Sequence, residues 1–272
     1  MGSPSRKALK IFYLNAQSIV KKIDELACVA GNLAPDIILI TESWCNSDIT
    51  DAFLSFDGYE LQTELRLDRQ DTTQGRGGGL LVYVREGVKI LTCDRKINFH
   101  QYCKLLVSDV TLYLIYRSPN APAQSLLDLE QLIRGAEKNS LFIGDFNMPD
   151  IDWETGHSSA RARPFVEAVE DCMMEQLENF STQVKGNCLD LVITNIPERV
   201  SEVVEAGRLG RSDHDMLCIT LEMENRTDGP VKQTTNWKRA DWQSMRADLA
   251  TVDWTSEIRA KNAGEMWNCL RL

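Results

Sequence analysis

Short apolar runs punctuate the chain and end at turn-forming residues. They are rich in Val, Ile, Leu and Tyr and are bounded by Gly, Asp, Asn or Pro. Runs of this length and composition predict buried β-strands. The predicted strands cover residues 9–14, 36–41, 79–85, 104–117, 140–146, 188–194 and 216–223.

Three longer segments repeat their apolar residues at helical spacing. They cover residues 18–33, 125–137 and 162–177. In the first, Ile19, Ile23, Leu26 and Ala30 form one stripe that ends near Gly31. Some strands are linked through these helices and others by hairpin-like turns, which favours an α/β fold with mixed sheets.

The pattern changes after residue 223. Residues 224–235, ENRTDGPVKQTT, are polar and turn-forming. We therefore predict a flexible N-terminus over residues 1–8, one domain over 9–224, and a linker with a short helical tail over 225–272. The tail contains Trp237, Trp242 and Trp254, and it is too short for a core of its own.

The net charge of the chain argues against one class of function. The net charge is −10, and outside residues 226–272 it is −12, so the protein is not a generally basic nucleic-acid coat. This balance is compatible with a local basic groove. It also suits a carboxylate-rich site whose charge is offset by a metal ion.

Cysteine usage and hydropathy indicate a reducing compartment. None of the eight cysteines forms a C-x-x-C pair, and several lie within apolar runs. The first residues contain no signal-peptide pattern, and no apolar run approaches the length of a membrane span. We expect reduced thiols and a nuclear or cytoplasmic location.

The stretch LFIGDFNMPD carries the first chemical signal. A buried strand ends in Asp145, Phe146 and Asn147. Residues two apart in extended backbone share a face, so Asp145 and Asn147 are predicted to point the same way while Phe146 packs inside. One strand tip would then offer a carboxylate and an amide together.

Other strand ends carry polar groups that apolar packing does not need. They are Asn15, Glu42, Tyr116, Arg117, Asp190, Ser212, Asp213 and His214. Taken singly, each has an ordinary structural explanation. The acids, the amide and the serine could be helix caps or turn residues, and His214 could be a structural histidine. Together, the oxygen ligands suit a hard cation such as Mg²⁺, which stabilises charge in phosphoryl transfer. Asp190 lies between leucines and needs a partner such as His214.

Other catalytic patterns lack support. The glycine-rich stretch at residues 74–84 has no Gly-Lys-Ser/Thr ending and precedes a strand, so it is predicted to form a tight turn and not a phosphate loop. The sequence contains neither G-x-S-x-G nor H-E-x-x-H, which removes the serine-hydrolase and zincin patterns.

Seven motifs in order resemble the endonuclease/exonuclease/phosphatase superfamily. They are LNAQS, DIILITESW, GRGGGLLVYVRE, YRSP, IGDFN, LDLVITN and RSDHDM. Over residues 9–224, the sequences of these motifs most resemble the apurinic-type endonuclease domain of non-LTR retrotransposons. The tail resembles the linker that leads towards reverse transcriptase in such elements. The resemblance implies a four-layer α/β sandwich of two packed mixed β-sheets flanked by helices.

The resemblance also implies a role for each polar residue. It assigns Glu42 as the main metal ligand, with Asn15 and Asp213 nearby. The implied catalytic residues are Asp145 for the attacking water, Asn147 beside it, His214 on the phosphate, Asp190 orienting His214, and Tyr116 on the phosphate. The implied substrate-binding residues are Arg117, Thr182 and Ser212. Where many relatives have an acid or amide two residues after the first asparagine, this chain has Gln17.

The function implied is a divalent-metal-dependent endonuclease. It would nick DNA and leave a 3′-hydroxyl for retroelement priming, with Mg²⁺, or Mn²⁺ in its place. The expected partner is DNA, with no membrane and no small-molecule cofactor, and a longer parent protein would carry the reverse transcriptase module. Two alternatives remain: a phosphatase of the same fold, and a catalytically dead nucleic-acid-binding remnant.

Overall fold

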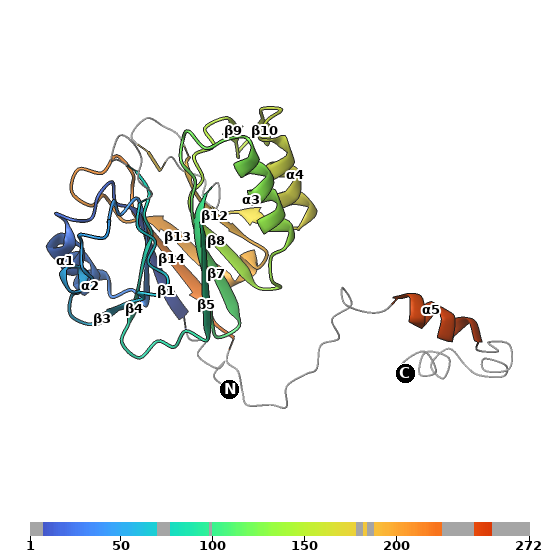
Figure 1. Cartoon of the computed structure of the whole chain (residues 1–272), viewed down its shortest axis with the longest axis horizontal. Helices are drawn as coiled ribbons and strands as arrows, with labels where there is room; N and C mark the ends of the chain where they lie inside the picture. Colours follow the sequence, from blue (N-terminus) through green and yellow to red (C-terminus); the bar gives the residue numbers. More distant parts are fainter. Residues whose placement is uncertain are drawn as a thin grey trace. The chain divides into compact units, whose positions relative to one another are not determined.

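The computed structural model describes residues 8–69, 77–97, 100–177, 182–183, 188–224 and 242–251. The chain divides into two units, residues 1–225 and 226–272. In the second unit the described residues form one helix, α5 (Trp242–Thr251) (Figure 1). Residues 1–7 of the predicted N-terminal segment, and Trp237 and Trp254 of the predicted tail, lie outside the described residues.

Two six-stranded mixed sheets form the centre of the first unit. The first sheet has the order β13 (Val200–Glu205), β14 (Leu217–Glu222), β1 (Ala8–Asn15), β2 (Ile37–Thr41), β4 (Leu81–Arg85), β3 (Tyr59–Leu61). The second has the order β11 (Glu175–Gln176), β12 (Asp190–Thr194), β8 (Ser140–Asp145), β7 (Val110–Tyr116), β6 (Gln101–Val107), β5 (Thr92–Ile97). A separate hairpin pairs β9 (Ile151–Asp152) with β10 (His157–Ser158).

Helices cover the outer face of each sheet. Helices α1 (Ile23–Leu33) and α2 (Asp51–Leu54) lie beside the first sheet, and α3 (Gln124–Arg134) and α4 (Arg163–Asp171) beside the second (Figure 1). A short 3-10 helix, η1 (Pro197–Arg199), precedes β13. This arrangement confirms the predicted four-layer sandwich of two packed mixed sheets flanked by helices.

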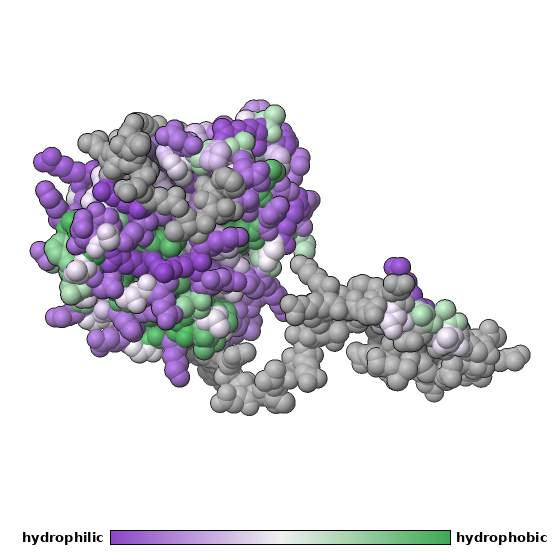
Figure 2. Space-filling view, viewed as in Figure 1, coloured by the Kyte–Doolittle hydropathy of each residue, from purple (hydrophilic) through white to green (hydrophobic). Residues whose placement is uncertain are grey.

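The alternation of side chains along β1 explains the layers. Leu9, Ile11 and Tyr13 point into the core between the two sheets, whereas Phe12 and Leu14 point into the core beneath α1. Successive side chains of a strand face opposite sides, so a run that is apolar throughout is buried on both faces. Tyr13 is completely buried on the face that meets the second sheet. The face seen in Figure 2 is covered mostly by hydrophilic side chains.

The structure corrects several predicted element bounds. Helix α1 begins at Ile23 and not at residue 18, because Gln17 and Ser18 have positive φ angles of 41° and 78°. Helix α4 ends at Asp171, and Met173 with φ 51° then turns the chain into β11. The predicted strand 104–117 is a hairpin, β6 and β7, which turns where Ser108 has φ 57°.

Other elements were missed by the pattern. Strands β3, β5 and β13 are largely exposed or half-buried, and β9, β10, β11 and α2 are very short. Such elements lack the continuous apolar run or the helical stripe on which the prediction depends. In the described part of the chain, no helix is long and apolar enough to cross a membrane.

Strand direction brings the polar strand ends to one edge of the sandwich. Strands β1 and β2 are parallel, and so are β7 and β8, so each pair ends at a common edge. Strand β12 runs antiparallel to β8, and its first residue, Asp190, pairs with the last residue of β8, Asp145. The two sheets therefore present their polar ends to the same region.

Gly144 lets β7 and β8 approach each other just before Asp145. Its φ is +153°, and an added Cβ would lie 1.9 Å from the carbonyl oxygen of its partner Ile115. We predict that Gly144→Ala lowers the free energy of unfolding by roughly 3 kcal/mol or more, because the backbone must move to relieve this clash. Urea unfolding followed by circular dichroism measures the loss.

Gly31→Ala is the matched control for that substitution. Gly31 lies in α1 with no atom within 4 Å of an added Cβ, so alanine should be neutral or stabilising by about 1 kcal/mol. Equal stability of the Gly144→Ala and Gly31→Ala proteins would show that the close approach at Gly144 does not matter.

Candidate active site

A buried carboxylate–histidine pair joins two distant parts of the chain. The Asp190 Oδ2 atom lies 2.5 Å from His214 Nδ1, and both side chains are buried. Burial lowers the pKa of His214, but the hydrogen bond to Asp190 and the charges of Asp190, Asp145 and Asp213 outweigh this effect. The pKa rises from 6.5 to about 9. His214 is therefore a cation at neutral pH, held in one orientation.

Tyr13 supports this pair from the opposite sheet. Its hydroxyl group donates to Asp190 Oδ1 at 2.5 Å and lies 3.0 Å from the Thr41 hydroxyl oxygen. The two oxygens of Asp190 thus bind a donor from the first sheet and the imidazole of His214. Sequence reasoning counted Tyr13 only as a strand residue. Its signal was the inward position in β1, because a buried tyrosine hydroxyl usually needs a polar partner.

Asp145 ends β8 in the middle of the polar cluster. Its Oδ2 accepts a hydrogen bond from Asn15 Nδ2 at 2.8 Å, and its Oδ1 accepts one from the Asn147 backbone N–H at 3.1 Å. Burial and the negative charge of Asp190 raise the pKa of Asp145 well above its ordinary value. A carboxylate with a raised pKa is a stronger base than a free carboxylate.

Asn147 contacts the Asp145 carboxylate through its backbone N–H group and not through strand alternation. Phe146 is fully buried, as predicted. Asn147, however, lies beyond the strand with φ 48°, and its side-chain amide donates to the Arg117 carbonyl oxygen at 2.8 Å. The alternation of an extended strand therefore ends at Asp145, and a left-handed turn brings the two residues together.

Glu42 directly follows β2, and like Asn147 it has a left-handed backbone, with φ 50°. Its carboxylate accepts hydrogen bonds from Trp44 Nε1 at 3.2 Å and from the Tyr116 hydroxyl group. Burial raises the pKa of Glu42, and the charge of His214 acts in the opposite direction. The Tyr116 hydroxyl has its pKa raised by burial and by the charge of Glu42, so it remains a neutral donor.

Asp213 and Ser212 close the cluster on the side of the first sheet. The Asp213 carboxylate accepts a hydrogen bond from Gln17 Nε2 and lies 3.7 Å from His214 Nε2. The Ser212 hydroxyl donates to the Asn15 carbonyl oxygen at 2.8 Å and accepts the His214 backbone N–H at 3.2 Å. Gln17 therefore positions Asp213, and Ser212 links β1 to the loop that carries His214.

Two predicted substrate-binding residues, Thr182 and Arg117, make hydrogen bonds inside the domain. Thr182 is fully buried, and its hydroxyl accepts the backbone N–H groups of Leu189 and Asp190, each at 3.2 Å. Arg117 is only 4% exposed. Its guanidinium group donates to the Ser125 hydroxyl at 2.8 Å and to the Asn147 carbonyl oxygen at 3.0 Å. Both side chains are therefore hydrogen-bonded inside the domain, and their contact with substrate stays a prediction.

Strained backbone marks the same region. Among the described residues, eight other than glycine have positive φ, and five of them lie in two loops and the β8 turn of this cluster: Gln17, Ser18, Glu42, Trp44 and Asn147. Such conformations cost free energy and persist only where the surroundings enforce them, often at functional sites. No pattern in the sequence predicts these backbone conformations.

The cluster has the donor set for a cation. Ligand atoms of Asp145, Asp190 and His214 lie within 4.8 Å of one another, so these residues form a group that could hold a metal ion. Within that group, Asp190 and His214 Nδ1 already bind each other. The carboxylate oxygens of Glu42 and Asp145 suit a hard cation such as Mg²⁺. The buried carboxylates outnumber the one imidazolium, which also favours a bound cation.

The arrangement can activate a nucleophile and stabilise an anion at once. Asp145, which could accept a proton, and the cation His214 lie at one edge of the sandwich. The charge of Asp190 raises the pKa of both. This combination is suited to phosphoryl chemistry, where catalysis consists mainly of positioning and charge stabilisation.

Comparisons with known proteins identify the class of this fold. Residues 110–218 match the family described as endonuclease-reverse transcriptase. Among proteins with curated functions, none matches the sequence. The structure is similar to the endonuclease domain of TRAS1, a telomere-specific non-LTR retrotransposon, with 15% identity and a TM-score of 0.59. That similarity covers 79% of this chain and 99% of the TRAS1 domain.

Two further nuclease structures show the same fold. The 3′-5′ exonuclease NExo from Neisseria meningitidis has 16% identity and a TM-score of 0.63, covering 79% of this chain and 100% of NExo. An AP endonuclease from Archaeoglobus fulgidus has 16% identity and a TM-score of 0.60, again covering 79% of this chain and 100% of the other. The chain thus shares the fold of these nuclease structures. Together with the match of residues 110–218 to the endonuclease-reverse transcriptase family, this confirms the resemblance seen in the sequence.

The bond between Tyr13 and Asp190 can be tested by removing one hydroxyl group. We predict that Tyr13→Phe destabilises the fold by roughly 2 kcal/mol, because a buried carboxylate loses a donor. Tyr83→Phe is the matched control: Tyr83 is equally buried but donates to the neutral Leu54 carbonyl oxygen at 2.9 Å. Tyr83→Phe should lower the free energy of unfolding by about 1 kcal/mol. Urea unfolding of both variants gives the comparison, and a smaller loss for Tyr13→Phe than for Tyr83→Phe would contradict it.

Proposed function

We propose that this domain is a divalent-metal-dependent endonuclease that hydrolyses DNA phosphodiester bonds. The observation that carries the proposal is the junction of Asp145, Asp190 and His214 where the two sheets meet. Two further facts support it: the family match over residues 110–218 and the shared fold with DNA nucleases. The solved NExo variant bound to a product DNA hairpin shows that this fold can accept DNA.

In the proposed reaction, Asp145 removes a proton from the attacking water. Asn15 and the Asn147 N–H group hold its carboxylate in place for this step. The water oxygen then bonds to phosphorus and the bond from phosphorus to the 3′ oxygen breaks. The leaving 3′ oxygen takes a proton from solvent to become a 3′-hydroxyl, and the phosphate stays on the 5′ side. A 3′-hydroxyl is the end that a reverse transcriptase in a longer parent protein could extend.

His214 and Asn147 serve the phosphate in this proposal. The imidazolium of His214, fixed by Asp190, places a positive charge where negative charge develops on the phosphoryl oxygens. Asn147 lies next to Asp145, where it can contact the phosphate or the water. Tyr116 acts through Glu42, which its hydroxyl group binds.

Glu42 is the proposed main metal ligand, with Asn15 and Asp213 at the edge of the same region. A bound Mg²⁺ would supply Lewis-acid stabilisation of the phosphoryl charge, and Mn²⁺ accepts the same oxygen ligands.

Supercoiled plasmid provides the test of the proposed function. The wild-type chain should convert it to the nicked form in Mg²⁺ and not in EDTA, and a DNA polymerase should extend the nicks directly. Asp145→Asn and His214→Ala should each slow nicking by about 10²–10⁴-fold, because each removes a group that acts on the reacting atoms.

Exposed residues of the same types serve as controls. Asp152 and His157 both lie exposed on the β9–β10 hairpin, so Asp152→Asn and His157→Ala should nick at the wild-type rate. Wild-type nicking by Asp145→Asn or His214→Ala would remove that residue from the site. A folded wild-type chain that does not nick, yet releases phosphate from a 3′-phosphorylated DNA end, would favour a phosphatase.

The metal assignment has its own test. We predict that Glu42→Gln raises the Mg²⁺ concentration for half-maximal nicking by about tenfold or more, because an amide is a weaker ligand than a carboxylate. Glu60→Gln, at an exposed position of β3, should leave the titration unchanged. Superimposable titrations for Glu42→Gln and the wild type would place the metal elsewhere.

A further inference from the structure

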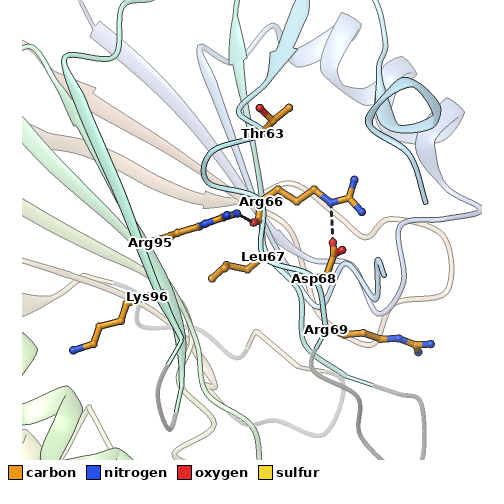
Figure 3. A pocket seen from close by; sticks show the side chains of 7 residues that line it. All are labelled: Thr63, Arg66, Leu67, Asp68, Arg69, Arg95 and Lys96. Carbon is orange, nitrogen blue, oxygen red and sulfur yellow. Dashed lines mark hydrogen bonds and ion pairs between the residues drawn. The ribbon is translucent and has the colours of Figure 1, made fainter. Parts of the chain in front are cut away.

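A basic groove lies beside the candidate active site. It is a cavity of about 630 Å³ lined by Thr63, Arg66, Leu67, Asp68, Arg69, Arg95 and Lys96 (Figure 3). Four of these residues are cations and one is an acid, in a domain whose overall charge is strongly negative. Only Leu67 is apolar, so the groove does not suit an apolar ligand.

One of the four cations has a structural role. The Arg66 guanidinium binds Asp51 at 2.5 Å and Asp68 at 2.7 Å, and it also donates to the carbonyl oxygens of Asn46 and Ile49. These bonds fix the segment that follows β3 and pair Asp68 with a positive charge. Arg66 is therefore part of the groove wall, and Asp68 does not act as an isolated negative charge within it.

The remaining cations are spread around the groove: in Figure 3, Arg95 points towards Arg66, and Lys96 and Arg69 point outward on opposite sides. Arg95 and Lys96 are exposed on the edge strand β5, and Arg69 lies on the opposite wall. One guanidinium nitrogen of Arg95 donates to the Arg66 carbonyl oxygen, and this uses one of five N–H donors. Figure 3 shows the three side chains spread apart, not converging on one point. Such spacing suits successive phosphates of a strand better than a single anion.

The groove is connected to the site through Gln101 and Gly78. Gln101 accepts the Gly79 N–H at 2.7 Å and donates to the Asp68 carbonyl oxygen at 3.0 Å, and it pairs with Tyr116 in the sheet. A Cβ built on Gly78 would lie 3.7 Å from both Arg69 Cα and Tyr116 Cε1. Tyr116 binds Glu42. Two residues, Gly78 and Tyr116, thus link the wall of the groove to the proposed metal ligand Glu42.

We propose that Arg69, Arg95 and Lys96 bind the phosphate backbone of the DNA strand that enters the active site. This inference rests on the proposed function and adds the surface along which the substrate lies. An acidic domain would otherwise repel DNA, and a local group of cations supplies the attraction that positions a strand without reading its sequence.

The test measures affinity without cleavage. The full chain is titrated against a fluorescein-labelled DNA duplex in EDTA, at several salt concentrations from 50 to 200 mM, and gels confirm that the duplex stays intact. Arg95→Gln/Lys96→Gln should weaken binding about tenfold at the lowest salt. It should also flatten the plot of log affinity against log salt by roughly 1.8, because two phosphate contacts are lost.

The control removes the same charge at the opposite end of the domain. Lys89 follows the last residue of β4 and Lys138 precedes the first residue of β8, and both are exposed. Lys89→Gln/Lys138→Gln should keep the wild-type slope. Lys96→Gln alone, which leaves the Arg95 bond to Arg66 intact, should flatten the slope by about half as much. Circular dichroism melting verifies the fold of each variant.

The outcomes separate this inference from the proposed function. Equal affinities and slopes for the groove variant and the control would overturn the groove assignment, even if the wild-type chain nicks plasmid. A groove effect on DNA binding in a chain that does not nick would support the groove and contradict the endonuclease. An effect seen only with an RNA duplex of the same sequence would overturn the assignment to DNA.

Discussion

The contact on which the rest of the site depends is the bond between Asp190 and His214. Asp190 begins a strand of one sheet, and His214 precedes a strand of the other, so the bond fixes how the two sheets meet at this edge. A buried carboxylate is costly unless it is fully paired. Tyr13 meets this requirement from β1, and the N–H group of Asp190 itself is bound by Thr182. One acid therefore organises groups from β1, β12 and two loops.

That constraint explains the electrostatics of the neighbouring groups. Asp190 and Asp145 are directly opposed on adjacent antiparallel strands, and burial together with the charge of Asp190 raises the pKa of Asp145. The same negative charge raises the pKa of His214. The charge of Asp190 thus favours the protonated forms of two neighbouring groups, the Asp145 carboxyl and the His214 imidazole. Glu42, on the far side of the cluster, is held by Tyr116 and Trp44 and completes a surplus of negative charge that a divalent cation would offset.

Much of the fold could be predicted because buried strands of a sandwich are apolar on both faces, as in β1, β2 and β7. The polar residues at their ends could be found for the same reason, since they interrupt that pattern. The sequence did not reveal which of them are buried. Thr182 and Arg117 are polar residues of a kind common at surfaces, and only their hydrogen bonds in the folded chain show that they support it. Tyr13 was hidden within an apolar run. The left-handed turns at Glu42 and Asn147 and the groove between the β3–β4 segment and β5 depend on tertiary packing, which local spacing does not encode.

The most direct test of this account is a double-mutant cycle between Asp190 and His214, read as the rate of plasmid nicking in Mg²⁺. Asp190→Asn, His214→Gln and the double variant are compared with the wild type after each has been shown to fold. Residues that act as one unit give strongly non-additive losses. The account predicts that the double variant is about as slow as the slower single variant. Losses that multiply would mean that Asp190 and His214 act independently, and the central role assigned to their bond would be wrong.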